Sequence, residues 1–155
     1  MSAIDARLEA LGLRLPGPYP PHDPLDAVVV HGARARTSGQ LPRGLDGRLV
    51  YPGTVGTTIE IEQGTEAARW CALNALSVLR AELGSLDRVE RVLTVLGFVA
   101  CAPGFESQAA VVDGASRLLY DVFGDAGRHT RSAIGVDALP RGGAVEIEVE
   151  VALRP

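Results

Sequence analysis

The chain has 155 residues, of which 46% are hydrophobic and 22% charged, so it can form a sizeable core and does not have the composition of a disordered protein. Its net charge of -4 argues against a protein that holds nucleic acid through a basic surface. Cys71 and Cys101 lie far apart and outside any metal or redox motif, so we expect two buried, reduced thiols and no bound metal. No apolar run is long enough to span a membrane and Met1 to Gly12 carries several charges, so we expect a cytoplasmic protein without a membrane partner.

A helix and an extended segment are expected before the first strand. Ile4, Leu8 and Leu11 recur at helical spacing and predict a helix over residues 2–11, ended by Gly12. Residues 16–24 contain five prolines, which excludes a helix interior or a central strand. We therefore expect residues 1–26 to form an N-terminal helix and a proline-rich lead-in to a single domain over residues 1–155.

The remaining chain alternates between strand and helix patterns. Ala68, Ala72 and Ala75 lie on one face of the first long helix, where small side chains let a helix lie close to a sheet. We expect strands at 27–30, 33–38, 49–51, 88–101, 132–136 and 145–153, and helices at 59–83 and 105–123. This order predicts an α+β fold with two long helices packed on one face of a mixed sheet.

The final strand alternates strictly between apolar residues and the carboxylates Glu146, Glu148 and Glu150. Glu148 and Glu150 are typical of a solvated strand face. Because like charges in one row repel each other, some of the three could instead face basic groups or a subunit boundary.

A turn at Leu139-Pro140 would place Arg131 close to Glu146. If the last two strands form a hairpin, Ala133 lies opposite Glu146 and Arg131 is its diagonal neighbour, about 7–8 Å away. A guanidinium can bind a carboxylate with two hydrogen bonds, and a nearby carboxylate can hold and deprotonate a water. The spacing alone leaves open either a site for a small acid or a plain Arg–Glu pair.

Several motifs, in this order along the chain, resemble the RidA/YjgF family. The segment Ser38-Gly39-Gln40-Leu41-Pro42 matches one landmark. The run from Arg128 to Val136, followed by Leu139-Pro140 and by Val145 to Glu148, matches the C-terminal signature. The resemblance covers the chain from about Leu8 onward. Within the family, the chain is similar to a longer branch that carries an N-terminal helix. It implies a chorismate-mutase-like fold and a homotrimer whose sites lie in clefts between neighbouring subunits.

The resemblance also implies an activity, the hydrolytic deamination of reactive 2-imino acids and enamines to 2-oxo acids and ammonia. No cofactor would be needed, because the imine carbon is already electrophilic. Arg131 falls on the carboxylate-binding arginine and Glu146 on the water-activating glutamate. Ser38 and Gly39 fall on the loop that lines the cleft. The expected partners are a small 2-imino or 2-oxo acid and further copies of the chain.

Three positions depart from the family pattern. Leu25 stands where a tyrosine is frequent, and Tyr19 could take that space only if the chain loops back. Asp113 stands where a cleft asparagine is common, and Ala133 stands where a cysteine is common. We expect Asp113 and Ala133 to line the substrate site.

Other functions stay open at this point. Because Arg131 alone would bind an acid, a non-catalytic trimer that binds a small carboxylate metabolite, as a sensor or interaction protein, is the alternative. RNA cleavage is the least supported because the chain is acidic and lacks a basic aromatic patch. We expect His129 to anchor a turn rather than to act as an acid or base.

Overall fold

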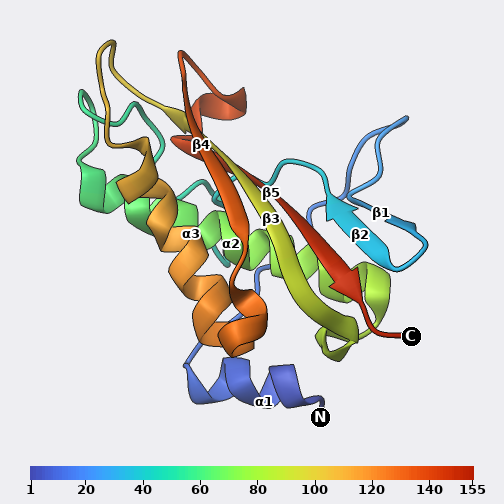
Figure 1. Ribbon diagram of the computed structural model, residues 1–155. Coiled ribbons are helices and arrows are strands. Elements are labelled where there is room, and N and C mark those ends of the chain that lie inside the picture. Colours follow the sequence, from blue (N-terminus) through green and yellow to red (C-terminus); the bar gives the residue numbers. More distant parts are fainter.

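The computed structural model describes residues 1–155 and is organised around one mixed sheet (Figure 1). Its strand order is β1-β2-β5-β3-β4, in which only the β3–β4 pair is parallel. The strands are β1 (Val28–His31), β2 (Arg34–Thr37), β3 (Val89–Ala100), β4 (Thr130–Val136) and β5 (Val145–Leu153).

The two long helices cover one face of this sheet, and the short N-terminal helix lies at the end of one of them (Figure 1). The α-helices are α1 (Ala3–Ala10), α2 (Ile61–Leu83) and α3 (Gln108–Phe123). Short 3-10 turns are η1 (Leu86–Arg88), η2 (Gly124–Gly127) and η3 (Pro140–Gly142). The predicted α+β architecture with its N-terminal helix is confirmed. No helix is both long and apolar enough to cross a membrane.

Helix α2 lies close to the sheet because its inner face is built from alanines. Ala68, Ala72 and Ala75 are completely buried. The helix begins two residues later than expected, since the backbone N–H of Glu60 donates to the Gln63 side chain at 2.8 Å and caps the first turn. It ends at Gly84, which adopts the left-handed conformation (φ 78°) that terminates helices.

Helix α1 is held by the carboxylate of Asp87 in η1. The backbone N–H groups of Ala3 and Ile4 each donate to this carboxylate at 2.8 Å. These hydrogen bonds lower the pKa of Asp87, because they favour its charged form. Leu8, on the inner face of α1, is buried in the core.

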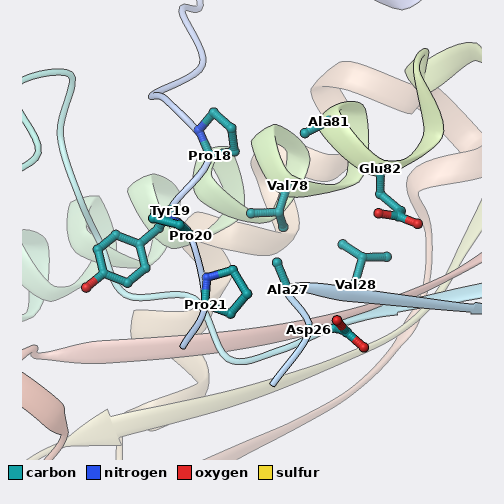
Figure 2. A pocket seen from close by; sticks show the side chains of 10 residues that line it. All are labelled: Pro18, Tyr19, Pro20, Pro21, Asp26, Ala27, Val28, Val78, Ala81 and Glu82. Carbon is teal, nitrogen blue, oxygen red and sulfur yellow. The ribbon is translucent and has the colours of Figure 1, made fainter. Parts of the chain in front are cut away.

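The proline-rich lead-in crosses the surface beside α2, as its composition predicted. Ser77 of α2 donates a hydrogen bond to the carbonyl of Pro16 at 2.5 Å. The next part of the lead-in, Pro18 to Pro21, borders a cavity of about 360 Å³ over α2 and the start of β1 (Figure 2). The ring of Tyr19 points away from Val78 and Ala81 of α2 in this view (Figure 2).

The prediction of a strand at residues 49–51 is wrong. This segment folds back on itself, with hydrogen bonds from Gly44 N–H to Arg48 O and from Val50 N–H to Pro42 O, each 2.8 Å long. Leu49 makes only one isolated bridge, to Arg43, and Tyr51 has a positive φ of 48° that bends the chain away from the sheet. Helix α3 also begins three residues late, because Phe105 closes a turn onto Ala102.

The expected hairpin between the last two strands is also wrong. Strand β3 lies between them, parallel to β4 and antiparallel to β5. The β3–α3–β4 segment is a crossover unit, in which a helix connects two parallel strands on one face of a sheet. As a result Ala133 lies opposite Gly97, while Glu146 lies opposite Phe98.

The two cysteines are free, as expected, but only Cys71 is buried. Burial raises the pKa of the Cys71 thiol well above its ordinary value. Cys101 is partly exposed at the end of β3, so the expectation that it is buried is wrong.

Candidate functional site

The three carboxylates of β5 have different surroundings. Glu148 pairs with Arg36 of β2 at 2.7 Å, and Glu150 pairs with Arg34 at 3.4 Å. Two of the three therefore face basic groups on the neighbouring strand. Glu146 has no hydrogen-bond or ion-pair partner, and it is the member of the row that remains available to a ligand.

Glu146 borders a cavity of about 270 Å³ whose lining includes Tyr19, Ser38, Gly39, Arg43 and Arg141. We call this space the Glu146 cavity. The segment Ser38–Pro42, which lines one side of this cavity, is fixed to β5 by two backbone hydrogen bonds between Gln40 and Ile147, at 2.9 and 3.1 Å. A Cβ atom at Gly39 would lie only 2.6 Å from Glu146 Oε1, so the absence of a side chain at Gly39 makes room for the carboxylate.

The pKa of Glu146 is raised. Partial burial is the main cause, and the charge of Glu148 adds to it, while Arg43 acts in the opposite direction. A half-buried carboxylate without a protein donor is a suitable acceptor for a proton from water.

The lead-in loops back so that both Tyr19 and Leu25 line the Glu146 cavity. A turn closed by Leu25 N–H donating to His22 O at 2.9 Å reverses the chain between them. Ser38, also in the lining, donates its hydroxyl proton to Asp26 O at 2.6 Å. The oxygen of Ser38 is therefore left to accept, rather than donate, a hydrogen bond from a ligand.

Two further residues of the cavity, Arg43 and Arg141, were not predicted from the sequence. Arg43 places its guanidinium 3.6 Å from the centroid of the Tyr19 ring. Arg141 donates to the Tyr19 hydroxyl at 3.3 Å. The available signal was their position, since Arg43 directly follows the Ser38–Pro42 landmark and Arg141 directly follows Leu139-Pro140.

Arg131 lies elsewhere, against α3. Its Nη1 donates to Asp113 at 2.9 Å and to Ser116 at 3.1 Å, and its Nη2 donates to the carbonyl of Ala109 at 3.3 Å. The Nε–H makes no hydrogen bond to the protein, and Nη2 makes only one. Nε and Nη2 form one edge of the planar guanidinium, the kind of edge that binds a carboxylate with two hydrogen bonds.

A hydrogen-bonded chain supports Arg131 from behind. His129 Nδ1 is 2.6 Å from Gly127 O, so this nitrogen donates and Nε2 accepts. Nε2 lies 2.9 Å from the hydroxyl of Ser116, which in turn accepts from Arg131. His129 thus anchors the turn, as expected, and it also orients the serine that holds the arginine.

The sheet separates Arg131 from Glu146. Arg131 lies opposite Val95, which lies opposite Val149, and both valines are buried on the helix-covered face. Glu146 lies opposite Phe98 on the other face. Paired residues share a face of a sheet, so one chain holds its arginine half (Arg131, Asp113, Ala133) and its glutamate half (Ser38, Gly39, Glu146) on opposite sides.

The cavity under the lead-in is a weaker candidate for an acid-binding site (Figure 2). Its charged lining groups are Asp26 and Glu82, both of which would repel a carboxylate. The side chains of the protein also include no group of three or more His, Cys, Asp or Glu arranged to hold a metal ion.

Comparisons with known proteins identify the family of the chain. Residues 5–145 match the model of the YjgF/chorismate-mutase-like endoribonuclease family. The chain belongs to this YjgF family. Protein TCP17 of Trypanosoma cruzi is 41% identical over 151 residues, which cover 97% of this chain and 94% of TCP17.

Solved structures of the YjgF family share the fold. One is a protein of Shewanella oneidensis MR-1 whose structure is described as that of an endoribonuclease. It is 30% identical to this chain with a TM-score of 0.93, and the match covers 98% of this chain and 100% of that one. E. coli TdcF, solved with bound serine, is 22% identical with a TM-score of 0.62, over 92% of this chain and 94% of that one. At that identity the second match supports the fold alone.

Proposed function

We propose that the protein hydrolyses reactive 2-imino acids to 2-oxo acids and ammonia, in a site completed by two copies of the chain. The observation that carries this proposal is Glu146, a half-buried carboxylate without a partner beside a cavity. The free edge of Arg131 would bind the substrate carboxylate from the neighbouring subunit. The family resemblance and the serine bound to TdcF agree with a small amino-acid-like ligand.

The proposed chemistry needs one proton carrier. Glu146 takes a proton from a water as the water oxygen bonds to the iminium carbon and the C=N π electrons move to nitrogen. Protonated Glu146 then gives this proton to the amine nitrogen. The hydroxyl proton then passes to Glu146 as the carbonyl forms and the C–N bond breaks. Glu146 gives that proton to the departing ammonia, which leaves as ammonium. General base catalysis of this kind contributes about 10²–10⁴-fold.

A non-catalytic carboxylate-binding trimer is the alternative. The free edge of Arg131 supports it equally, because that edge can bind a carboxylate whether or not hydrolysis follows. Binding alone gives no reason for the unpaired Glu146, whose ionised form is disfavoured by its surroundings. We therefore place hydrolysis first.

The test follows imine decay directly. An amino-acid oxidase generates 2-iminobutanoate in the presence and absence of the protein, and the disappearance of the imine is measured. Glu146→Gln should lower kcat by about 10²-fold or more while the protein still binds 2-oxobutanoate. Arg131→Ala should weaken the binding of both acids and abolish measurable turnover.

Matched variants serve as controls. Glu148→Gln and Arg128→Ala change the same residue types outside the proposed machinery and should retain activity at neutral pH. If the wild type does not accelerate the decay of any imine generated from several parent amino acids, the deaminase proposal is wrong. If 2-oxobutanoate still binds in that case, the carboxylate-binding alternative is supported.

A further inference from the structure

The Glu146 cavity contains two arginines whose charge no protein carboxylate neutralises. Neither Arg43 nor Arg141 has an acidic side chain within ion-pair distance. Arg141 donates only to the Tyr19 hydroxyl, and the Arg43 guanidinium makes no hydrogen bond at all, although it stacks on the same tyrosine ring. Most hydrogen-bond donors of the two guanidiniums are therefore available to a ligand.

The fold fixes the backbone at both arginines. The carbonyl of Arg43 accepts a hydrogen bond of 2.8 Å from Asn74, a polar residue of α2 that is only 1% exposed. Arg141 has a positive φ of 58°, an uncommon conformation for a residue other than glycine, and the next residue, Gly142, is fixed by a 2.9 Å hydrogen bond from Gly53. Tyr19 contacts both cations, Arg43 through its ring and Arg141 through its hydroxyl.

The lining of the cavity carries more positive than negative charge. It includes two guanidiniums, of half-buried Arg43 and exposed Arg141, and one carboxylate, Glu146, which forms no ion pair with either arginine. If Arg131 of the neighbouring subunit binds the carboxylate next to the imine, Glu146 must lie near the reacting carbon. The far end of the substrate then extends toward Arg43 and Arg141.

We propose that the preferred substrates are 2-imino acids whose side chain ends in a second carboxylate, bound by Arg43 and Arg141. This inference rests on the proposed deaminase function. It assigns specificity to two residues outside the family motifs and restricts the substrate to short diacids. A neutral side chain of the same length would leave both guanidiniums without a partner.

The test compares 2-iminosuccinate and 2-iminoglutarate with 2-iminobutanoate, each generated in situ by a suitable oxidase. We expect kcat/KM to be about 10-fold or more higher for the diacids, as hydrogen bonds between charged groups allow. Arg43→Gln and Arg141→Gln should each lower kcat/KM for the diacids by about 10-fold or more and change it by less than about 3-fold for 2-iminobutanoate. Arg48→Gln, in the same loop as Arg43 but outside the lining of the cavity, should change neither.

Binding of stable products separates this inference from the proposed reaction. Calorimetry should give a lower Kd for 2-oxoglutarate than for 2-oxobutanoate, and Arg43→Gln should remove the difference while Arg43→Lys restores part of it. Equal Kd values, or arginine variants that impair both substrates alike, would overturn the diacid assignment. Loss of turnover for every imine, with the binding preference intact, would instead overturn only the deaminase function.

Discussion

At the scale of single residues, Gly39 determines where the Glu146 carboxylate can lie. A Cβ at this position would approach Glu146 Oε1 to 2.6 Å and Cδ to 2.7 Å. The backbone of Gly39 is not in the left-handed region, so alanine is tolerated by the main chain itself.

Gly39→Ala should therefore impair the reaction more than the fold. We expect kcat to fall about 10²-fold, because a displacement of about 1 Å at a reacting group has effects of this size. The free energy of unfolding should change by less than about 1 kcal/mol. The control is Gly17→Ala, where a Cβ meets no atom within 4 Å. Unchanged turnover in Gly39→Ala would argue against Glu146 as the base.

The pH dependence of the reaction should report the raised pKa of Glu146. The base must be ionised, so kcat/KM should fall with decreasing pH at a higher pH than for an ordinary glutamate. Because the charge of Glu148 contributes to this shift, Glu148→Gln should move the acid limb to lower pH. A pH–rate profile of both proteins checks this, and an acid limb at or below the ordinary glutamate range would contradict it.

The raised pKa of Glu146 also affects stability. An ion-paired carboxylate raises the free energy of unfolding when it is ionised, whereas ionised Glu146 lowers it. The folded protein disfavours ionised Glu146, so Glu146→Gln should raise the free energy of unfolding above the raised pKa. The gain should vanish below the ordinary glutamate pKa, where Glu146 is protonated in both states. Chemical denaturation at neutral and acidic pH measures the difference.

At the scale of elements, helices α2 and α3 cross at Gly114. A Cβ there would overlap the backbone carbonyl of Thr65, an atom that cannot move without bending α2. Alanine normally stabilises a helix relative to glycine by about 1 kcal/mol. Gly114→Ala should instead destabilise the protein by about 2 kcal/mol or more, measured by chemical denaturation. The exposed Arg117→Ala on the same helix should stay within about 0.5 kcal/mol of the wild type.

Sequence patterns predicted the elements better than the way in which they pair. The alternation of β5, the alanine face of α2 and the end of that helix at residue 83 are local features, and all three predictions were correct. The pairing of β4 with β3 is a long-range choice, and the short connection at Leu139-Pro140 suggested a hairpin instead. The β3–α3–β4 order was the signal that should have prevailed, since a strand, helix and strand in sequence usually form a parallel crossover.

The same limits applied to the candidate site. Arg131 and Glu146 were selected by family motifs, and their assumed contact rested on the wrong strand pairing. Arg43 and Arg141 lie in irregular segments without periodicity, so no local rule indicates that both reach Tyr19. Only the folded chain brings together residues from the lead-in, the segment after Ser38 and η3.

At the scale of the whole molecule, the separation of Arg131 and Glu146 by the sheet makes a clear prediction. If each site combines one residue from each of two neighbouring subunits, then Arg131→Ala and Glu146→Gln proteins should complement one another. Mixed in equal amounts under conditions of subunit exchange, they should recover about a quarter of the wild-type sites in a cyclic trimer. The measurement is deaminase activity before and after exchange.

The controls for complementation are the two single variants, each exchanged with itself, which should keep their own low activities. Light scattering should show the same oligomer in all samples. If activity does not return although mixed oligomers form, both residues act within one chain, and if either single variant is active before exchange, that residue is dispensable. Either outcome would contradict a shared site.

The position of β5 has a consequence for how the protein is made. Strand β5 follows every other strand in the chain, yet it lies between β2 and β3, and no other strand connects the β1–β2 pair to the β3–β4 pair. During synthesis and folding, the two parts of the sheet therefore stay unjoined, with exposed edges, until residues 145–153 are free to pair. Those edges are competent to pair with other chains during that interval. The segment that carries Glu146 thus completes the sheet and ends the period in which the nascent chain is prone to aggregate.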